Sequence, residues 1–265
     1  MNIGELVVEP IYDGVMRAPA PVFFGGTTSE QWAPHKQFLD PDGQIRFDLG
    51  GFLVRGAGDR AVLVDAGIGP RSGLIRDGAG KFEGGELLNS LAKRGVRPED
   101  VTDVVFTHLH FDHVGWATQD GAVVFPNATF RCDVRDLEHF RDNERVWPTV
   151  GPIAERIQTW SGSGPLLPGV DVMSAPGHTP GSTIVVMSSG TARGMLLGDV
   201  VHCPVELIDE EWAGVGDFDA ELARRTRNAL ARELEGTDTP VAAAHFPGLV
   251  FGRLLSGNGR RAWVV

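Results

Sequence analysis

The stretch THLHFDH, from Thr107 to His113, places three histidines and an aspartate within six residues. Imidazole nitrogens bind zinc and neighbouring transition metals, and a carboxylate oxygen is compatible with the same ions. The stretch follows the apolar run DVVF, so it should leave a buried strand, where alternate residues His108 and His110 point the same way. Asp112 and His113 come next, as the chain turns, and can face a second point. The spacing therefore predicts one loop that serves two metal ions.

Three further candidate ligands each follow an apolar run: His178 in SAPGHTPGS, Asp199 in MLLGDVV and His245 in VAAAHFPG. Each is interpreted as lying at a strand end, and strand ends gathered at one edge can assemble a site. With the loop, they make five histidines and two aspartates, enough for two metals that share a carboxylate and keep positions open for water. Isolated histidines are usually core or surface residues, and His35 and His139 are interpreted in that way.

The first half of the chain contains elements that could position this loop. Residues 45–65 hold two β-branched runs separated by a glycine-rich turn, a hairpin pattern whose second strand ends at Asp65. The run ELLNSLAKRG has helical spacing and a plausible stop at Gly95, and it precedes the strand that delivers His108.

The second half repeats this order of strand, aspartate, helix, strand and histidine. Its helix is predicted from about Asp219 to Leu234, before the strand that delivers His245. Two similar β-rich halves with helices outside predict an α+β fold, a four-layer αββα sandwich that forms a single domain over residues 1–265.

Three other segments have weaker patterns. Short strands are expected over 122–132, and two helices interrupted near Trp147-Pro148 over 133–160. The segment 18–43 is rich in proline, glycine and aromatic residues and is predicted to be an ordered loop near the site. A surface cover over a minor core is the alternative for that segment.

Composition and charge disfavour several classes of partner. The 265 residues carry 24 basic and 35 acidic side chains, a net charge of −11, which disfavours nucleic acid and anionic membranes as partners. No apolar stretch is long enough to span a bilayer, and the N-terminus lacks a signal-peptide pattern, so a cytoplasmic location is expected. Cys132 and Cys203 are expected to be ordinary buried thiols. The expected partner is a small-molecule substrate, with a homodimer as an open alternative.

HLHFDH followed by separated His178, Asp199 and His245 resembles the metallo-β-lactamase superfamily, over roughly residues 45–250. The resemblance implies a dinuclear hydrolase with two divalent ions, zinc above all, with iron, manganese or cobalt as alternatives. It implies one metal held by His108, His110 and His178. The other would be held by Asp112, His113 and His245, with Asp199 as the bridge and Asp65 orienting a ligand histidine.

Further features indicate which branch of the superfamily this sequence resembles. A common class of zinc β-lactamases has cysteine where Asp199 stands, and neither a glutathione-binding helical domain nor a basic RNA-processing domain is visible. The pattern is most similar to quorum-quenching lactonases and methyl parathion hydrolase-like enzymes. Such lactonases place a tyrosine three residues after the bridging aspartate, where this chain has His202; its only tyrosine is Tyr12.

The resemblance implies hydrolysis of a neutral, apolar ester-type bond, in a lactone or an aryl ester or phosphotriester, by a bridging hydroxide. Asp112 could carry the proton to the leaving group, and His202 could stabilise that group or the oxyanion, unless it merely packs behind the site. Phe111, Trp116, Phe23 and Trp32 are candidates for an apolar substrate pocket, with the core as the equal alternative.

Two other functions are compatible with the same residues. Persulfide dioxygenases and flavodiiron proteins resemble this fold but hold iron and perform redox chemistry. A metal-dependent binding protein without activity is the non-enzymatic alternative.

Overall fold

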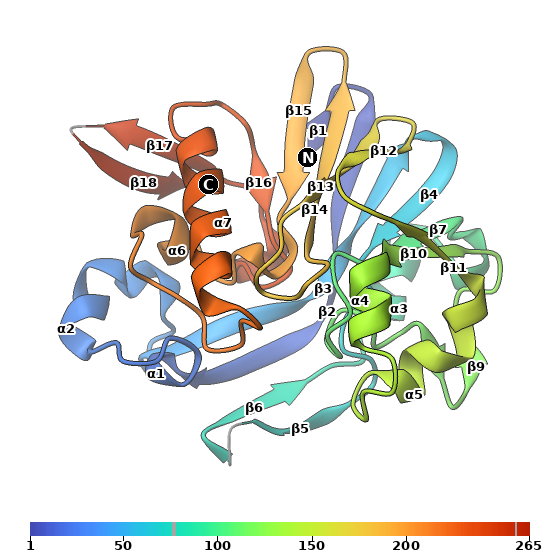
Figure 1. Cartoon of the computed structure of the whole chain (residues 1–265), viewed down its shortest axis with the longest axis horizontal. Helices are drawn as coiled ribbons and strands as arrows, with labels where there is room; N and C mark the ends of the chain where they lie inside the picture. The colour runs from blue at the N-terminus through green and yellow to red at the C-terminus, as the bar shows by residue number, and fades with distance from the viewer. Residues whose placement is uncertain (76–77, 258) are drawn as a thin grey trace.

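Two mixed β-sheets pack face to face, and helices cover the outer face of each (Figure 1). The computed structural model describes residues 1–75, 78–257 and 259–265. The four-layer αββα architecture predicted from the sequence is therefore confirmed. Among the described residues, no helix is long and apolar enough to cross a membrane.

The first sheet runs in the order β11-β10-β7-β4-β3-β2-β6-β5, with β1 paired to β2. The hairpin expected over 45–65 is confirmed as the antiparallel pair β3 and β4. The strands of this sheet are β1 (Asn2–Ile3), β2 (Leu6–Pro19), β3 (Gln44–Gly56), β4 (Gly58–Val64), β5 (Ser72–Ile75), β6 (Gly80–Glu83), β7 (Asp103–Val105), β10 (Thr129–Asp133) and β11 (Ile157–Trp160).

The second sheet runs in the order β12-β13-β14-β15-β16 and comes from the second half of the chain. Its strands are β12 (Gly164–Leu167), β13 (Val170–Ser174), β14 (Thr183–Ser189), β15 (Ala192–Leu196) and β16 (Val241–Ala242). Two small hairpins lie outside the sheets, formed by β8 (Thr118–Gln119) with β9 (Ala122–Val123) and by β17 (Arg253–Gly257) with β18 (Arg260–Val264).

Alternating side chains build the three buried layers between these elements. In β4, Val62 and Val64 face the layer between the sheets, whereas Leu63 faces the helices outside the first sheet. In β14, Val185 faces the layer between the sheets and Ile184 faces the helix outside the second sheet. Because neighbouring strand residues point to opposite faces, continuous apolar runs are required where a sheet is covered on both sides.

The described helices are short except for α7. They are α1 (Ala20–Phe23), α2 (Ser29–Trp32), η1 (Ala33–Phe38), α3 (Leu87–Ala92), η3 (Pro98–Asp100), α4 (Val134–His139), α5 (Trp147–Val150), η4 (Gly151–Arg156), η5 (Gly198–Val200), α6 (Val205–Ile208), α7 (Ala220–Leu234) and η6 (Pro247–Leu249). The helix predicted from about Asp219 is α7, and Asp219 caps it by accepting a hydrogen bond from the Leu222 N–H at 2.9 Å.

Two segments differ from their predicted structure. Trp147 and Pro148 begin α5 rather than interrupt a helix, because proline fits the first turn, where its missing N–H costs nothing. The segment 133–160 also ends in a strand, β11. The segment 18–43, expected as a loop, contains α1, α2 and η1, whose aromatic side chains form a separate core cluster.

Parallel strand directions bring the candidate ligands to one edge of the sandwich. β4 and β7 are parallel, so Asp65 and the loop that begins with His108 follow their carboxyl ends on the same side. In the second sheet, β15 and β16 are parallel and deliver Asp199 and His245 in the same way. β13 and β15 both run antiparallel to β14 and therefore point in the same direction. His178, which follows β13, thus lies at the same edge as Asp199.

Candidate metal centre

Buried carboxylates hold the loop from His108 to His113 in place through hydrogen bonds. Asp65 accepts hydrogen bonds from the Thr107 backbone N–H and hydroxyl, both at 2.8 Å. Asp136 accepts one from the Leu109 N–H at 3.0 Å. Asp65 itself has a φ of 61°, a backbone conformation that is uncommon for a residue with a side chain and often marks a functional site.

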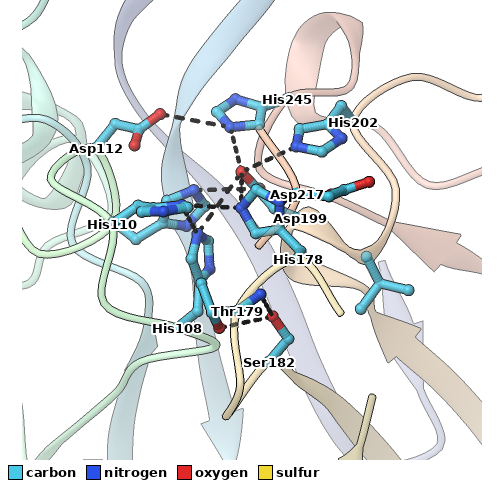
Figure 2. Close-up of polar contacts among 12 residues, drawn as sticks. His108, His110, Asp112, His178, Thr179, Ser182, Asp199, His202, Asp217 and His245 are labelled. Atoms are coloured by element: carbon cyan, nitrogen blue, oxygen red, sulfur yellow. Dashed lines mark hydrogen bonds and ion pairs between the residues drawn. The ribbon is translucent and has the colours of Figure 1, made fainter. Parts of the chain in front are cut away.

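The first group of candidate ligands comprises His108, His110, His178 and Asp199 (Figure 2). His110 Nδ1 lies 3.1 Å from His108 Nε2 and 2.9 Å from His178 Nε2. Asp199 Oδ2 lies 3.7 Å from His108 Nε2 and 3.6 Å from His178 Nε2. Three nitrogens and one oxygen therefore converge, a donor set that suits zinc.

The second group comprises Asp112, His113 and His245, and Asp199 adjoins it as well. His245 Nε2 lies 3.5 Å from Asp112 Oδ2 and 3.1 Å from Asp199 Oδ2. The other oxygen of Asp199, Oδ1, lies 3.2 Å from His113 Nε2. The structure thus brings together all seven residues expected as ligands and places Asp199 against both groups.

Three of the histidines have an oxygen acceptor at the nitrogen that faces away from the cluster. His113 Nδ1 lies 2.9 Å from Asp65 Oδ2, His178 Nδ1 lies 3.0 Å from Asp217 Oδ1, and His245 Nδ1 lies 3.3 Å from the Asp48 carbonyl. An acceptor at Nδ1 holds the proton there, which leaves Nε2 as a lone-pair donor aimed at the cluster.

Burial lowers the pKa values of His108 and His110 well below that of free histidine, and nearby imidazoles add to the effect. These rings are therefore neutral, as metal ligands must be. Burial likewise disfavours charge on His113, but Asp199 and Asp65 outweigh it and raise its pKa.

Two buried atoms within the cluster, His113 Nε2 and Asp199 Oδ1, lie 3.2 Å apart but have no partner in hydrogen-bond geometry. A buried polar atom without a partner is costly, and a cation between them would satisfy both. The donor set and these two atoms fit a divalent metal ion at each group.

His202 lies beside the cluster but belongs to neither group. Its Nε2 is 3.6 Å from Asp199 Oδ2, and its side chain is 12% exposed. Burial disfavours its charge, yet Asp199 and Glu206 outweigh that effect and raise its pKa to about 9. In the metal-free chain these two carboxylates therefore favour the protonated form of His202.

The four aromatic pocket candidates have different surroundings. Trp116 is buried and donates its indole N–H to Asp13 at 2.8 Å, and Trp32 is buried against Trp212 and Phe24, so both are core residues. Both indoles are enclosed by residues of distant segments, Trp116 by Asp13 and Trp32 by Trp212. The pocket prediction was wrong for these two.

Phe111 and Phe23 remain partly exposed. The Phe23 ring lies 4.5 Å from that of Phe47, measured between centroids, and the Phe47 ring lies 5.3 Å from that of His245. Phe47 is itself a buried core residue, so of this pair only Phe23 offers partly exposed apolar surface.

The sequence analysis missed several carboxylates that hold the site. Asp217 lies in the segment between α6 and α7, where no pattern marks it, Glu206 lies among the apolar residues of α6, and Asp136 lies among the polar residues of α4. Only their buried contacts with His178, His202 and the loop near Leu109 identify them. Outside the site, His139 contacts Phe218 and His35 contacts Trp212.

Comparison with known proteins places this arrangement in context. The sequence profile of the metallo-beta-lactamase superfamily matches residues 51–245. An N-acyl homoserine lactonase from a Bacillus species is 29% identical over 191 residues, which cover 65% of this chain and 72% of that protein. Metallo-beta-lactamase domain-containing protein 1 of Mus musculus is 31% identical over 176 residues, covering 65% of this chain and 59% of that protein.

Among solved structures, AidC, a dizinc quorum-quenching lactonase in complex with a product, superposes with a TM-score of 0.86 at 24% identity. The match covers 100% of this chain and 95% of that one. At this level of identity, the likeness concerns the fold.

Proposed function

The chain belongs to the metallo-beta-lactamase superfamily, and we propose that it is a dinuclear metal-dependent hydrolase that opens neutral, apolar lactones. The observation that carries the proposal is the position of Asp199, whose carboxylate adjoins both groups of candidate ligands. A carboxylate shared by two nitrogen-rich groups is suited to hold two cations side by side.

His108, His110 and His178 would hold one ion, and Asp112, His113 and His245 the other, with Asp199 shared. Zinc is the proposed metal because imidazole and carboxylate ligands suit it. When bound, the two ions lower the pKa of water and polarise the substrate's carbonyl or phosphoryl oxygen.

The chain's own residues supply the proton transfers. Asp112 is the proposed proton carrier to the leaving alkoxide, because it stands at the edge of the second group, 3.5 Å from His245 Nε2. Asp65 keeps the His113 proton on Nδ1, and His202 is proposed to stabilise the leaving group or the oxyanion.

The substrate class follows from charge and apolar surface. A net charge of −11 disfavours polyanions, and the partly exposed Phe23 and Phe111 offer apolar contacts near the cluster. The match to an N-acyl homoserine lactonase supports a lactone. A surface hollow of about 620 Å³ near Arg17 and Lys81 contains none of these residues. We therefore place substrate binding at the cluster, where the chemistry lies.

Phosphotriesters and aryl esters are the second candidate class. His202 stands three residues after Asp199, and the chain's only tyrosine, Tyr12, packs against the core between the sheets. A mechanism assisted by histidine instead of tyrosine is compatible with such substrates.

An activity panel on metal-reconstituted protein tests the proposal. We expect two metal ions per chain by elemental analysis, and hydrolysis of acyl lactones in preference to aryl esters, phosphotriesters and a cephalosporin. Asp112→Asn should abolish turnover, whereas Asp120→Asn, at an exposed aspartate, should not. One ion per chain, or oxygen-dependent turnover with iron alone, would contradict the proposal.

A further inference from the structure

Helix α7 carries a buried arginine behind the candidate metal centre. Arg227 is fully buried, and its guanidinium nitrogens lie 3.4 Å from Glu206 Oε1 and 3.8 Å from Asp217 Oδ2. One of these nitrogens also donates to the Val200 carbonyl at 3.1 Å. A guanidinium removed from water is tolerated only where anionic partners compensate it. We call Arg227, Glu206 and Asp217 the α7 charge cluster.

Each carboxylate of the α7 charge cluster also holds one histidine of the site. Asp217 accepts from His178 Nδ1 at 3.0 Å, and the two side chains lie together in Figure 2. Glu206 accepts from the His202 backbone N–H at 2.6 Å, and its Oε2 lies 3.5 Å from His202 Nδ1. The His178 and His202 rings are neighbours, with centroids 4.8 Å apart.

The Val200 carbonyl adds a third connection, because Val200 directly follows Asp199 in η5. One guanidinium therefore contacts three groups, on Val200, Glu206 and Asp217, each of which adjoins or contacts a residue of the site. The opposite side of the centre is held differently. His113 and His245 have partners on the first-sheet side, Asp65 and the Asp48 carbonyl.

We propose that Arg227 is a positioning residue for one of the two metal positions, the one formed by His108, His110 and His178. The inference rests on the proposed metal assignment. Arg227 compensates the charge of Asp217 and holds this carboxylate against His178 Nδ1, which keeps Nε2 free for the metal. Without Arg227, Glu206 and Asp217 would lose the buried cation that lies beside both, and His178 would lose its fixed orientation.

A matched pair of arginine variants on α7 tests this role. Arg227→Met keeps the length and apolar volume of the side chain but removes its charge. Arg225→Met changes an exposed arginine of the same helix that pairs with Glu221. Stepwise dissociation constants for Zn²⁺ would be measured by chelator competition on metal-free protein.

We expect Arg227→Met to weaken one of the two Zn²⁺ sites by about ten- to a hundredfold, a typical effect of losing a partner behind a ligand histidine. The other site should stay within about threefold of wild type, and Arg225→Met should leave both unchanged. A folded Arg227→Met protein with two wild-type constants would overturn the proposal.

A readout without metal separates this inference from the proposed function. In ¹⁵N-histidine spectra of the metal-free protein, the Nδ1–H signal of His178 should shift or broaden in Arg227→Met, while that of His113 should persist. If wild type binds no metal, the proposed function fails. The His178 signal then still tests whether Arg227 positions the His178 ring. An unchanged His178 signal would overturn the positioning role.

A charge-balanced variant covers the case in which Arg227→Met does not fold. Arg227→Met combined with Glu206→Gln and Asp217→Asn leaves no uncompensated charge in the α7 charge cluster. We expect it to fold and to retain the weakened Zn²⁺ site, because the amide that replaces the Asp217 carboxylate is a poorer acceptor. Wild-type Zn²⁺ affinity at both sites would show that the three charges of the α7 charge cluster balance one another without affecting the metal ligands. That result would overturn the proposal.

Discussion

Asp199 has contacts with both groups of candidate ligands, through both of its oxygens. Asp199→Ala would remove a ligand from both proposed metals and leave two cations with less compensating charge. We expect metal content and turnover to collapse together, as measured by elemental analysis and a lactone assay. Asp238→Ala, at an exposed aspartate, is the control. Two retained ions with near-normal turnover would show that the shared ligand is another residue.

His202 lies close enough to Asp199 to act on a substrate bound there. If it protonates the leaving group, His202→Ala should lower kcat by about 10² to 10⁴ while metal content stays at two. The defect should grow from aryl to alkyl leaving groups, because basic alkoxides need a proton to depart. Assays along such a series check this, and a uniform defect would assign the proton to Asp112 alone.

Asp136 predicts a dependence of stability on pH. Burial raises its pKa from 3.8 to about 6, although the Leu109 and Gly181 N–H groups and the Thr179 hydroxyl donate to it. The folded state therefore binds this proton more tightly than the unfolded chain does, and its contribution to stability is lost as pH rises through about 6. The difference between the two pKa values corresponds to about 3 kcal/mol.

Urea denaturation of metal-free wild type and Asp136→Asn measures this contribution, because the variant cannot titrate there. Between pH 4 and pH 7, the free energy of unfolding of wild type should fall by roughly 2.4 kcal/mol relative to that of Asp136→Asn, because the unfolded carboxyl is already partly ionised at pH 4. A difference that stays constant over this range would refute the expected protonation.

At the scale of elements, the His178 loop is packed closely on the first turn of α7. A Cβ on Gly177 would come within 2.3 Å of the Ala223 backbone, and the Gly177 carbonyl accepts a hydrogen bond from the Asp219 N–H at 2.9 Å. The φ of Gly177 is 137°, a conformation that favours glycine. The loop and helix therefore depend on the absence of a side chain at this position.

Gly177→Ala should separate the loop from α7, destabilise the protein and weaken metal binding through His178. Gly162→Ala is the matched control, since φ is 77° there but no atom lies within 4 Å of the added Cβ. We expect Gly177→Ala to cost about 1 to 3 kcal/mol more than the control, measured by denaturant unfolding. Equal costs would mean that only the backbone conformation matters.

At the scale of the whole molecule, the proposed metals join the two sheets, because both halves of the chain donate ligands. An ion that binds only the folded state stabilises it by about 2.7 kcal/mol at a concentration of 100 Kd. For a chain of this size, we expect chelation to lower Tm by about 5 to 10 °C. Zn²⁺ should restore it and Mg²⁺ should not, because imidazole ligands disfavour Mg²⁺. A Tm indifferent to chelator would contradict a structural contribution of the metals.

The seven candidate ligands and several of the strands and helices could be predicted from the sequence. The HLHFDH loop, the hairpin over 45–65 and the amphipathic α7 are encoded by local spacing, which holds wherever the segment lies in the fold. Parallel strands then determine that His178, Asp199 and His245 share an edge with the loop, because their carboxyl ends lie on one side.

The groups that surround the ligands were decided only by tertiary structure. Arg227 and Asp217 are ordinary charged residues in the sequence, and they become partners because α7 folds across the second sheet and buries them together. Trp32 and Trp116 carry the same apolar surface that a substrate pocket would need, so their residue type could not separate pocket from core. Burial depends on which distant segments pack against a side chain, and neighbouring residues in the sequence do not encode that.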